Sequence, residues 1–447
     1  MCASTREPQF ISLGFAYQSS ARASQSALID VIVAVIKKSE EERIRVVLMT
    51  TAPEALHFFL RRQAQSLAEH GYEVHTISSP GFNQFTAGIT PSGTHHELPM
   101  KRTISPFNDI RSLCALWCVL RRIRPHIVQT HTPKAGLLGM LAAYSAAVPI
   151  RIYTMNGLAI RLQNPFGAIV LSVTERIACA LSTEVLCVSR SVRRLAIAYR
   201  FCRSRKCSVL GDGGSHGVDL SKFDGRLDGI RDRKRVRREY HISDDAIVIG
   251  YVGRMVPGKG INELALAWSL LRDKFPTALM LLCGYCEPEH PMQGGVLERL
   301  RNDPRVRITD KRVLDMPSIY AAIDVVVLPS YCEGLPNVAL EAAAMKVPII
   351  ATRVPGCVDA IRNNVTGLLV EPKNHKQLVS ALEFLIRHPE RREAMGRAAR
   401  EFIAKRFSEI RISTLILTKY REITHCIDNR PSRSASQNVN KPDLIHD

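Results

Sequence analysis

The chain has 447 residues, of which 46% are hydrophobic and 23% are charged; this composition excludes an intrinsically disordered protein and favours two globular domains. The formal net charge is +19, and residues 1–211 carry +13 of it, from 25 Lys and Arg against 12 Asp and Glu. This excess suits an anionic lipid surface or a phosphorylated substrate, whereas an aromatic content of 6% argues against a nucleic-acid-binding protein.

The twelve cysteines are scattered along the chain, which favours neither a disulfide framework nor a zinc site, so we expect a reducing, cytoplasmic setting. Arg6 and Glu7 are not followed by the apolar core of a signal peptide. An uncharged, largely apolar run at residues 135–150 has 16 residues and contains Pro149. This run is too short for a membrane span. We expect a helix followed by a strand there.

Residues 1–42 precede the first clear strand. Within them and running to residue 43, the stretch ALIDVIVAVIKKSEEER fits either an apolar helix with a charged end or a poorly ordered extension. The residues alone leave both interpretations open.

Strands alternate with helices from Arg43 onward, a pattern typical of a parallel sheet built from βαβ units. A helix over residues 54–70 ends at Gly71, and a helix over residues 105–124 has apolar residues at core-facing spacing, with membrane contact as the alternative. The strands are predicted at residues 43–50, 73–78, 126–130, 150–154, 184–189 and 207–211. We therefore predict a Rossmann-like domain over residues 43–211.

A glycine-rich connection at residues 211–225 leads into a basic run, residues 226–238, which we interpret as a solvated helix. The second half then repeats the architecture, with a helix over residues 262–274 and strands at residues 246–253, 278–284, 306–309, 324–330 and 347–352. We predict a second Rossmann-like domain over residues 212–400. Residues 401–447 are assigned to a helical segment, which starts near Arg391 and ends at Ile423, and to a polar, disordered tail.

The stretch VVVLPSYCEGLPNVALEAAAM, residues 325–345, reads as a buried strand, a tight turn and a helix that begins near Asn337. A helix N-terminus presents unpaired N–H groups and a partial positive charge, so an anion such as a diphosphate suits it. Glu333 lies on the turn and Glu341 about one helical turn inside. Glu333 can reach whatever such an anion carries, and Glu341 lies near the same pocket, although either glutamate alone fits an ordinary exposed position.

The stretch GRMVPGKG, residues 253–260, follows another predicted strand and begins another helix. Its glycines permit close approach of the backbone to a phosphate, and Arg254 and Lys259 supply positive charge. It is not a P-loop, because no Ser or Thr follows the GK pair.

In this order and spacing, the two stretches resemble the retaining glycosyltransferases of family 4, which have the two-domain GT-B fold with two Rossmann-like domains facing a cleft. The resemblance covers residues 43–423 and is closest to bacterial enzymes that extend lipid-diphosphate-linked glycans. Further matches are THTPKAGLLG (130–139), VSRSVR (188–193), HGVDLSKF (216–223), DMPSIYAAIDV (315–325) and VPGCVDAI (354–361).

The resemblance implies that the second domain binds a nucleoside-diphosphate sugar. Glu333 would hold the donor sugar, Glu341 the ribose hydroxyls, and Arg254 and Lys259 the diphosphate. The remaining donor-binding residues would be two glycines and the residues at the helix N-terminus: Gly253, Gly334, Leu335, Pro336, Asn337 and Val338.

The first domain would bind the acceptor. The resemblance makes His131 a catalytic residue together with Glu333, Arg254 and Lys259, and makes Lys134, Arg193 and Arg102 candidates for the acceptor diphosphate. Three positions depart from the family pattern: Asn156 and His216 replace a histidine and an asparagine, and Asp310 replaces a glycine.

We expect transfer of a hexose or N-acetylhexosamine, with UDP as the leaving nucleotide, to a polyprenyl-diphosphate glycan in exopolysaccharide, lipopolysaccharide or capsule biosynthesis. Because no Asp-x-Asp triplet is present and two cations face the phosphates, we expect no metal and no cofactor. The protein would be cytoplasmic and peripheral on an anionic membrane surface, with no nucleic-acid partner. A UDP-sugar 2-epimerase of the same fold and a binding protein without turnover are the alternatives.

Overall fold

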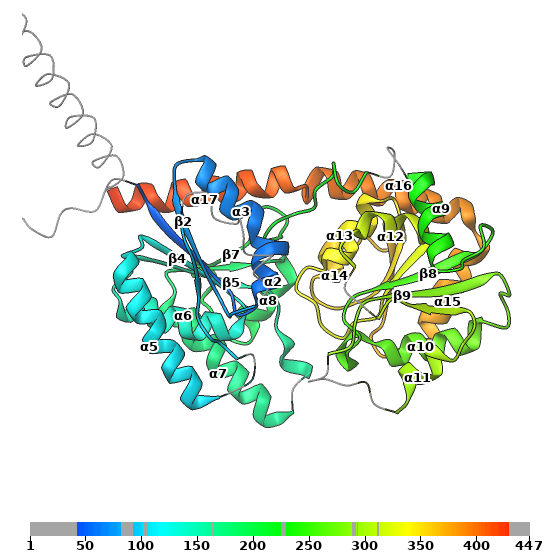
Figure 1. Ribbon diagram of the computed structural model, residues 1–447, viewed down its shortest axis with the longest axis horizontal. Coiled ribbons are helices and arrows are strands. Elements are labelled where there is room, and N and C mark those ends of the chain that lie inside the picture. The colour runs from blue at the N-terminus through cyan, green and yellow to red at the C-terminus, as the bar shows by residue number, and fades with distance from the viewer. Residues whose placement is uncertain are drawn as a thin grey trace, which may run out of the picture.

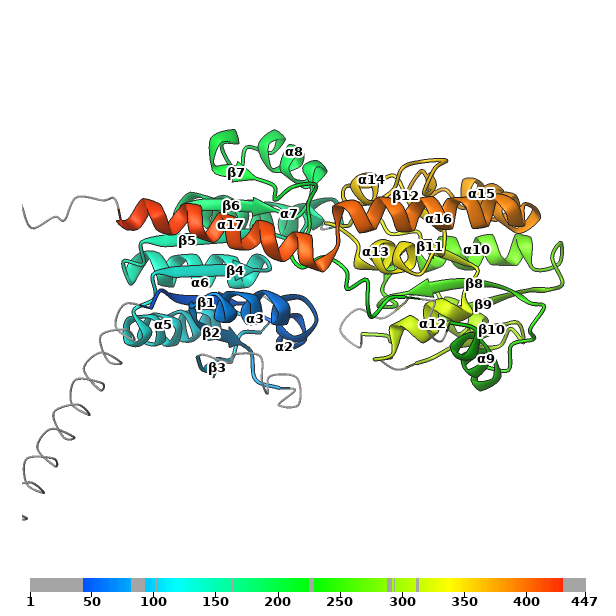
Figure 2. The same ribbon diagram turned by 90° about the horizontal axis from the view of Figure 1, so that it is seen from above.

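The computed structural model describes residues 43–428 apart from residues 82–92, 102, 104, 163, 225–228, 288–291, 293 and 311–312. The expected extension at residues 1–42 and the tail beyond residue 428 lie outside the described residues. Two α/β domains stand side by side, and a long helical segment runs along both of them (Figures 1 and 2).

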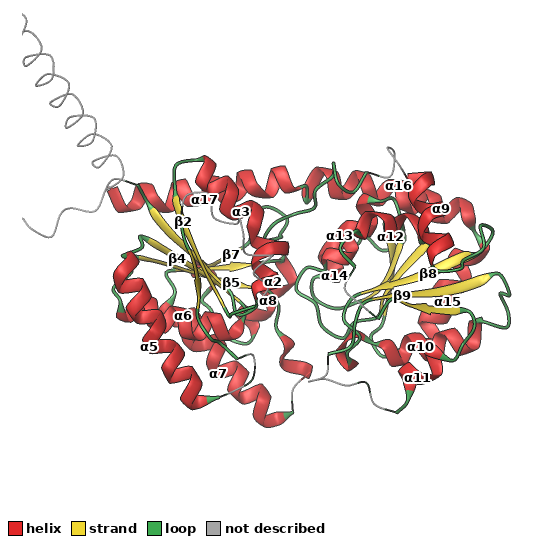
Figure 3. Ribbon diagram, viewed as in Figure 1, coloured by secondary structure: helices red, strands yellow, loops and turns green. Residues whose placement is uncertain are grey.

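The first domain holds a seven-stranded sheet in the order β3-β2-β1-β4-β5-β6-β7, and every neighbouring pair is parallel. The interior strand β1 is almost fully buried, because helices cover both faces of the sheet (Figure 3), and this explains its continuous apolar sequence. The strands are β1 Arg45–Met49, β2 Glu73–Ser78, β3 His95–Glu97, β4 Ile127–His131, β5 Ile150–Met155, β6 Glu184–Cys187 and β7 Cys207–Ser208.

The helices of this domain lie on both sides of the sheet (Figure 3). A π-helical turn, Leu56–Leu60, separates the first two. They are α2 Pro53–Ala55, α3 Arg61–Glu69, α5 Pro106–Ile123, α6 Pro133–Ser145, α7 Pro165–Leu181 and α8 Arg190–Ala198.

The second domain holds a six-stranded parallel sheet in the order β10-β9-β8-β11-β12-β13. Its strands are β8 Ile247–Val252, β9 Ala278–Cys283, β10 Val306–Ile308, β11 Val325–Leu328, β12 Ile349–Thr352 and β13 Gly367–Val370. Its helices are α9 Gly229–Glu239, α10 Ile261–Leu271, α11 Val296–Arg301, α12 Met316–Ala322, α13 Asn337–Ala344, α14 Cys357–Ala360, α15 His375–Arg387 and α16 Pro389–Arg406.

Both sheets reverse their strand order at one point, between β1 and β4 in the first and between β8 and β11 in the second. In sheets of this kind, ligands bind outside the carboxyl ends of the strands at that point. The two-domain α/β architecture predicted from the sequence is confirmed.

The last helix, α17 Glu409–Asp428, returns to the first domain and packs on β1, β2 and α3. Ile412, Ile416 and Tyr420 are buried there, and the Tyr420 hydroxyl donates a hydrogen bond to Gln129 Oε1 at 2.5 Å. This contact ties the end of the described chain to β4.

The structure differs from the sequence-based prediction in three places. The short strands β3 and β13 were not predicted, because β3 is polar and β13 begins with a glycine. The helix predicted from Arg391 to Ile423 is instead two helices, α16 and α17. It breaks because Val218 pairs with the backbone on both sides of Ser408, at Phe407 O and Glu409 N, each at 2.9 Å.

The run at residues 135–150 forms most of α6 and the first residue of β5, as predicted. Within the described residues, none of the helices combines the length and the apolar character that crossing a bilayer requires.

A buried carboxyl group lies beneath the first domain's cleft-facing helices. Glu175 of α7 is fully buried, and the Tyr153 hydroxyl lies 3.1 and 2.9 Å from its two carboxylate oxygens. Burial raises the pKa of Glu175 from 4.5 to about 7, only partly offset by this hydrogen bond, and it raises the pKa of Tyr153 as well.

We predict that this group makes the fold less stable at high pH. Below pH 4.5 both folded and unfolded chains hold the proton; between about 4.5 and 7 only the folded chain holds it, so the free energy of unfolding falls by about 3 kcal/mol over that window and then levels off. Glu175→Gln keeps an acceptor for Tyr153 and removes the charge. Urea unfolding at pH 5 and pH 8 should show a smaller pH-dependent loss in the variant. Equal losses in both proteins would contradict the assignment.

Candidate active site

A cleft of about 1030 Å³ lies between the two domains, at the carboxyl ends of the strands that flank both reversal points. Thr50 and Thr51 follow β1, and His131 ends β4; Gly253 and Arg254 follow β8 on the other side. Ligand pockets typically have volumes of about 300–1,000 Å³, so this cleft has room for a large ligand.

The second-domain wall of the cleft is formed by the turn before α13 and the N-terminus of that helix. Pro336 is the N-cap residue and has no N–H of its own, and its side chain makes no capping hydrogen bond. The first two residues of α13, Asn337 and Val338, line the cleft, so an anion bound there would complete the hydrogen bonding of the helix N-terminus.

The turn is held against the first domain by close backbone packing at Gly334. A Cβ atom at this position would lie 1.7 Å from the carbonyl oxygen of Asn156, so only glycine fits. The Ser189 hydroxyl donates a hydrogen bond to the Gly334 carbonyl at 2.8 Å. The neighbouring Glu333 is thereby placed at the boundary between the two walls.

Glu333 forms an ion pair with Lys259, whose Nζ lies 2.5 Å from Glu333 Oε1, and both side chains are mostly buried. Lys259 is positioned by a tight turn that ends at Gly260, which has a φ of 71°. A Cβ on Gly260 would lie 2.1 Å from the Pro329 carbonyl oxygen. The glycines of GRMVPGKG thus allow two loops to pack closely, and they also leave the backbone open to the cleft.

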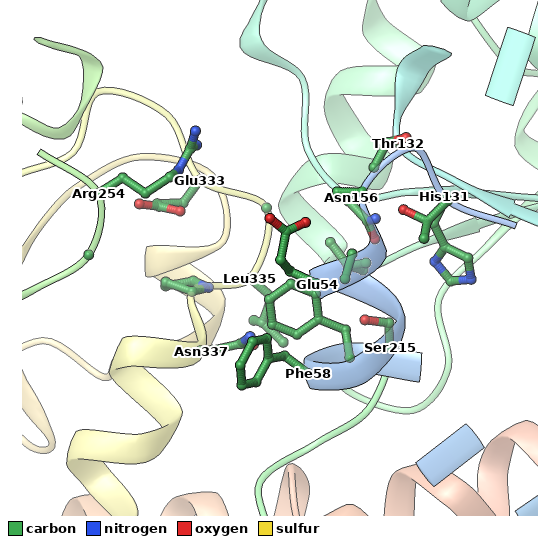
Figure 4. Close-up of a pocket in the computed structure, with 18 of the residues that line it drawn as sticks. Glu54, Phe58, His131, Thr132, Asn156, Ser215, Arg254, Glu333, Leu335 and Asn337 are labelled. Atoms are coloured by element: carbon green, nitrogen blue, oxygen red, sulfur yellow. The ribbon is translucent and has the colours of Figure 1, made fainter. Parts of the chain in front are cut away.

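Arg254 lies on the same wall, near Glu333 (Figure 4). Its guanidinium group forms an ion pair with Glu287 at 2.8 Å and is about half exposed. Lys134, on the opposite wall at the start of α6, pairs with Asp109 at 2.7 Å and also donates to the Thr103 carbonyl. Each of the three cleft-lining cations assigned to a phosphate from the sequence therefore already contacts a carboxylate.

Glu341 lies on α13 one turn behind the cleft surface and is not among the residues that line the cleft. It accepts a hydrogen bond from the Tyr320 hydroxyl at 2.8 Å. Burial raises its pKa from 4.5 to about 7, and the Tyr320 hydrogen bond and the charge of Lys222 offset only part of that rise.

The first-domain wall contains a buried histidine. His131 is 3% exposed, and its Nε2 has no hydrogen-bond partner among the described residues. Burial lowers the pKa of His131 to about 3 and the pKa of the neighbouring His216 to about 4, so both rings are neutral at pH 7. Both residues line the cleft. The neutral His131 ring can form a hydrogen bond with a ligand, but it cannot act as a protonated general acid.

Besides Glu341, one more of the described residues predicted from the sequence lies outside the cleft. Arg193, on α8, donates to the Cys207 carbonyl at 2.7 Å and to Ser204, and it does not line the cleft. Arg102 lies outside the described residues. The predicted residues that do line the cleft are His131, Lys134, Gly253, Arg254, Lys259, Glu333, Gly334, Leu335, Pro336, Asn337 and Val338.

The cleft also contains residues that were not singled out from the sequence as binding residues. Glu54, Phe58 and Phe59 come from the helix that follows β1, and Asn156, noted only as a departure, faces them (Figure 4). Its position shortly after the carboxyl end of a strand inside the sheet could have identified Glu54 as a candidate binding residue from the sequence.

The domains are also joined by α8, whose N-terminus points at the second domain. Asp359 accepts hydrogen bonds from the Ser191 backbone N–H at 3.3 Å and from the Ser191 hydroxyl. The Gly356 N–H donates to the same hydroxyl at 2.7 Å. A carboxylate of one domain thus caps a helix of the other.

Two protein-family models match the chain: "Glycosyl transferase 4-like domain" over residues 56–213 and "Glycosyl transferases group 1" over residues 232–402. The capsular polysaccharide biosynthesis glycosyltransferase CapM of Staphylococcus aureus is 34% identical over 352 residues, covering 78% of this chain and 90% of CapM.

A second relative is the Escherichia coli UDP-Gal:alpha-D-GlcNAc-diphosphoundecaprenol alpha-1,3-galactosyltransferase, which is 28% identical over 63% of this chain and 71% of its own length. Among solved structures, Anabaena HepE in complex with UDP has a TM-score of 0.67 at 16% identity and matches 87% of this chain and all of HepE. WaaG, a lipopolysaccharide glycosyltransferase, has a TM-score of 0.62 at 16% identity over 81% of this chain and 95% of WaaG.

These matches confirm the resemblance seen in the sequence and the GT-B fold expected from it. The chain belongs to the family 4 glycosyltransferases, with a glycosyl transferase 4-like domain followed by a group 1 domain.

Proposed function

We propose that this glycosyltransferase transfers a hexose or N-acetylhexosamine from a UDP-sugar to a polyprenyl-diphosphate-linked glycan in surface polysaccharide biosynthesis, with retention of anomeric configuration. One observation carries the proposal. The N-termini of α13 and α6, each suited to bind an anion, face the same cleft from opposite walls, and Glu333 lies between them. Two relatives support it: the Escherichia coli enzyme is a UDP-Gal:alpha-D-GlcNAc-diphosphoundecaprenol galactosyltransferase, and CapM is a glycosyltransferase of capsular polysaccharide biosynthesis.

The donor diphosphate fits the second-domain wall. The N–H groups of α13, Arg254 and Lys259 would hold it, so negative charge that grows on the leaving group is stabilised by groups already in place. These groups supply the charge that a metal ion would otherwise provide. Glu341 would accept the ribose hydroxyls, with Tyr320 fixing its second oxygen.

The transfer step would occur on one face of the donor sugar. The acceptor hydroxyl oxygen forms a bond to the anomeric carbon on the side from which the diphosphate leaves, and the departing phosphate oxygen takes the hydroxyl proton. Glu333 would hold donor-sugar hydroxyls through charge-assisted hydrogen bonds. Neutral His131 would hydrogen-bond a sugar hydroxyl through its unpaired Nε2.

Membrane contact would involve the first domain. Phe107 and Ile110 of α5 and Phe166 and Ile169 of α7 are between 62% and 90% exposed, and both helices lie on the side of the domain away from α17 (Figures 1 and 2). Residues 1–211 also carry the larger charge excess. Exposed aromatic and aliphatic side chains beside basic residues are typical of surfaces that rest on anionic lipid.

The proposed reaction is tested with a panel of UDP- and GDP-sugars and a synthetic prenyl-diphosphate sugar, in the presence of EDTA. We expect mass spectrometry to show addition of one hexose or N-acetylhexosamine from a UDP-sugar, and NMR to show the donor's anomeric configuration in the product. An inverted linkage, loss of turnover in EDTA, or C2 epimerisation of a UDP-sugar without acceptor would contradict the corresponding part of the proposal.

Two groups of substitutions should separate ground-state binding from charge stabilisation. Glu341→Gln should weaken UDP binding by roughly 1.5 to 3 kcal/mol, the value of a charged hydrogen bond, with a smaller effect on kcat. Arg254→Ala and Lys259→Ala should lower kcat more than donor affinity, because charge grows on the diphosphate as the bond breaks. Calorimetry with UDP and steady-state kinetics give both quantities. Unchanged UDP affinity in Glu341→Gln, or equal losses of affinity and kcat in the cation variants, would refute these roles.

Membrane binding should depend on charge and on the exposed side chains of α5 and α7. The protein should sediment with phosphatidylglycerol vesicles at about 50 mM salt and bind far less at about 500 mM, since screening weakens a gain of about 1 kcal/mol per cation. Phe107→Ser with Phe166→Ser should reduce binding. The control, Leu266→Ser with Leu270→Ser, alters two half-exposed residues of α10 in the second domain. Equal effects of the two pairs would place the lipid contact elsewhere.

A further inference from the structure

The segment Pro53–Leu60 has an irregular helical conformation. It leaves the carboxyl end of β1 as a short α-helical turn, continues as the π-helical turn Leu56–Leu60, and becomes regular again in α3. π-helical turns are rare and frequently mark functional sites, because they redirect the side chains that follow. This one faces the cleft.

The two faces of this segment differ. Leu56 and Leu60 are buried in the first domain's core. Phe58 and Phe59 lie away from that core, are each 40% exposed, and line the cleft. A pair of large apolar side chains left open to water in a substrate cleft calls for an explanation, because their burial elsewhere would be favourable.

A carboxylate accompanies these aromatic rings. Glu54 precedes Phe58 by four residues, a spacing that puts two side chains on the same side of a helix. Both project from the helix into the space between the domains, facing Leu335 and Asn337 of the opposite wall (Figure 4). The ring of Phe59 lies 5.1 Å from that of His216, at the side of the cleft where His131 also lies.

Sugars are recognised by this combination of groups. The C–H face of a pyranose packs on an aromatic ring, while its hydroxyls donate charge-assisted hydrogen bonds to a carboxylate. The donor sugar is assigned to Glu333 on the opposite wall. A sugar bound at Glu54 and Phe58 would therefore be a second one, facing the donor across the cleft.

We propose that Glu54, Phe58 and Phe59 form a subsite for a sugar residue of the acceptor glycan. The subsite rests on the proposed function, since it assumes a carbohydrate acceptor. Glu54 would accept hydrogen bonds from two hydroxyls, and the Phe58 and Phe59 rings would cover the apolar face of the same sugar. The subsite thereby selects the acceptor, whereas the wall around α13 selects the donor.

The simpler alternative is that Glu54 only stabilises its own helix, because an acidic residue in the first turn interacts favourably with the helix dipole. That role predicts an effect on stability and none on ligand affinity. A binding measurement that does not require turnover separates the two.

The test uses the full chain, saturating UDP and a water-soluble probe, α-D-GlcNAc diphosphate on a short prenyl chain. Saturation-transfer NMR on the sugar protons gives the Kd. We expect about tenfold weaker binding for Glu54→Gln and for Phe58→Ala, near wild-type binding for Phe58→Tyr, and an unchanged UDP affinity. The controls are Glu69→Gln on α3 and Phe384→Ala on α15, which lie outside the cleft.

The outcomes separate the subsite from the reaction. Probe binding with this dependence, in a protein that transfers no sugar, would keep the subsite and refute the proposed transfer. Transfer with wild-type Kd in Glu54→Gln and Phe58→Ala would overturn the subsite. No saturation transfer from the wild-type protein to the sugar protons of the probe would overturn it as well. So would a parallel loss of UDP affinity in variants with unchanged melting temperature.

Discussion

The cleft depends on one close backbone contact, where the turn that carries Glu333 meets the first domain. Gly334 packs against the Asn156 carbonyl, and a Cβ on Gly356 would lie 2.2 Å from the Gly334 carbonyl oxygen. A side chain at Gly334 would keep the two walls apart, and a side chain at Gly356 would displace the turn from its own domain. The Ser189 and Asp359 hydrogen bonds reinforce the approach from α8. Because of it, groups separated by some 200 residues in the sequence, such as His131 and Glu333, face one space.

The cleft has few unpaired charges. Arg254, Lys259 and Lys134 each contact a carboxylate, and burial keeps His131 and His216 neutral. In the proposed reaction, a diphosphate bound at α13 would compete with Glu333 and Glu287 for Lys259 and Arg254. Loss of the Lys259 ion pair would free Glu333 to bind sugar hydroxyls, which would couple nucleotide binding to sugar binding.

The sequence predicted the fold well because parallel strands buried on both faces are continuous apolar runs, as in β1 and β11. It also placed Glu333 on the turn before α13, and Arg254 and Lys259 in the segment between β8 and α10. It could not reveal that Lys259 forms an ion pair with Glu333, 74 residues away, nor that Arg193 donates its hydrogen bond to the Cys207 carbonyl. Helical periodicity did not distinguish Glu54 and Phe58 from an ordinary solvent face, because the wall opposite them comes from the other domain.

The most direct test of the central claim, that α13 and its neighbouring cations hold the donor diphosphate, is a crystal structure of the protein with UDP. We expect diphosphate oxygens within hydrogen-bonding distance of the first N–H groups of α13, of Arg254 and of Lys259, with the Lys259–Glu333 distance longer than its present 2.5 Å. A diphosphate bound elsewhere, with the Lys259–Glu333 and Arg254–Glu287 ion pairs intact, would contradict it.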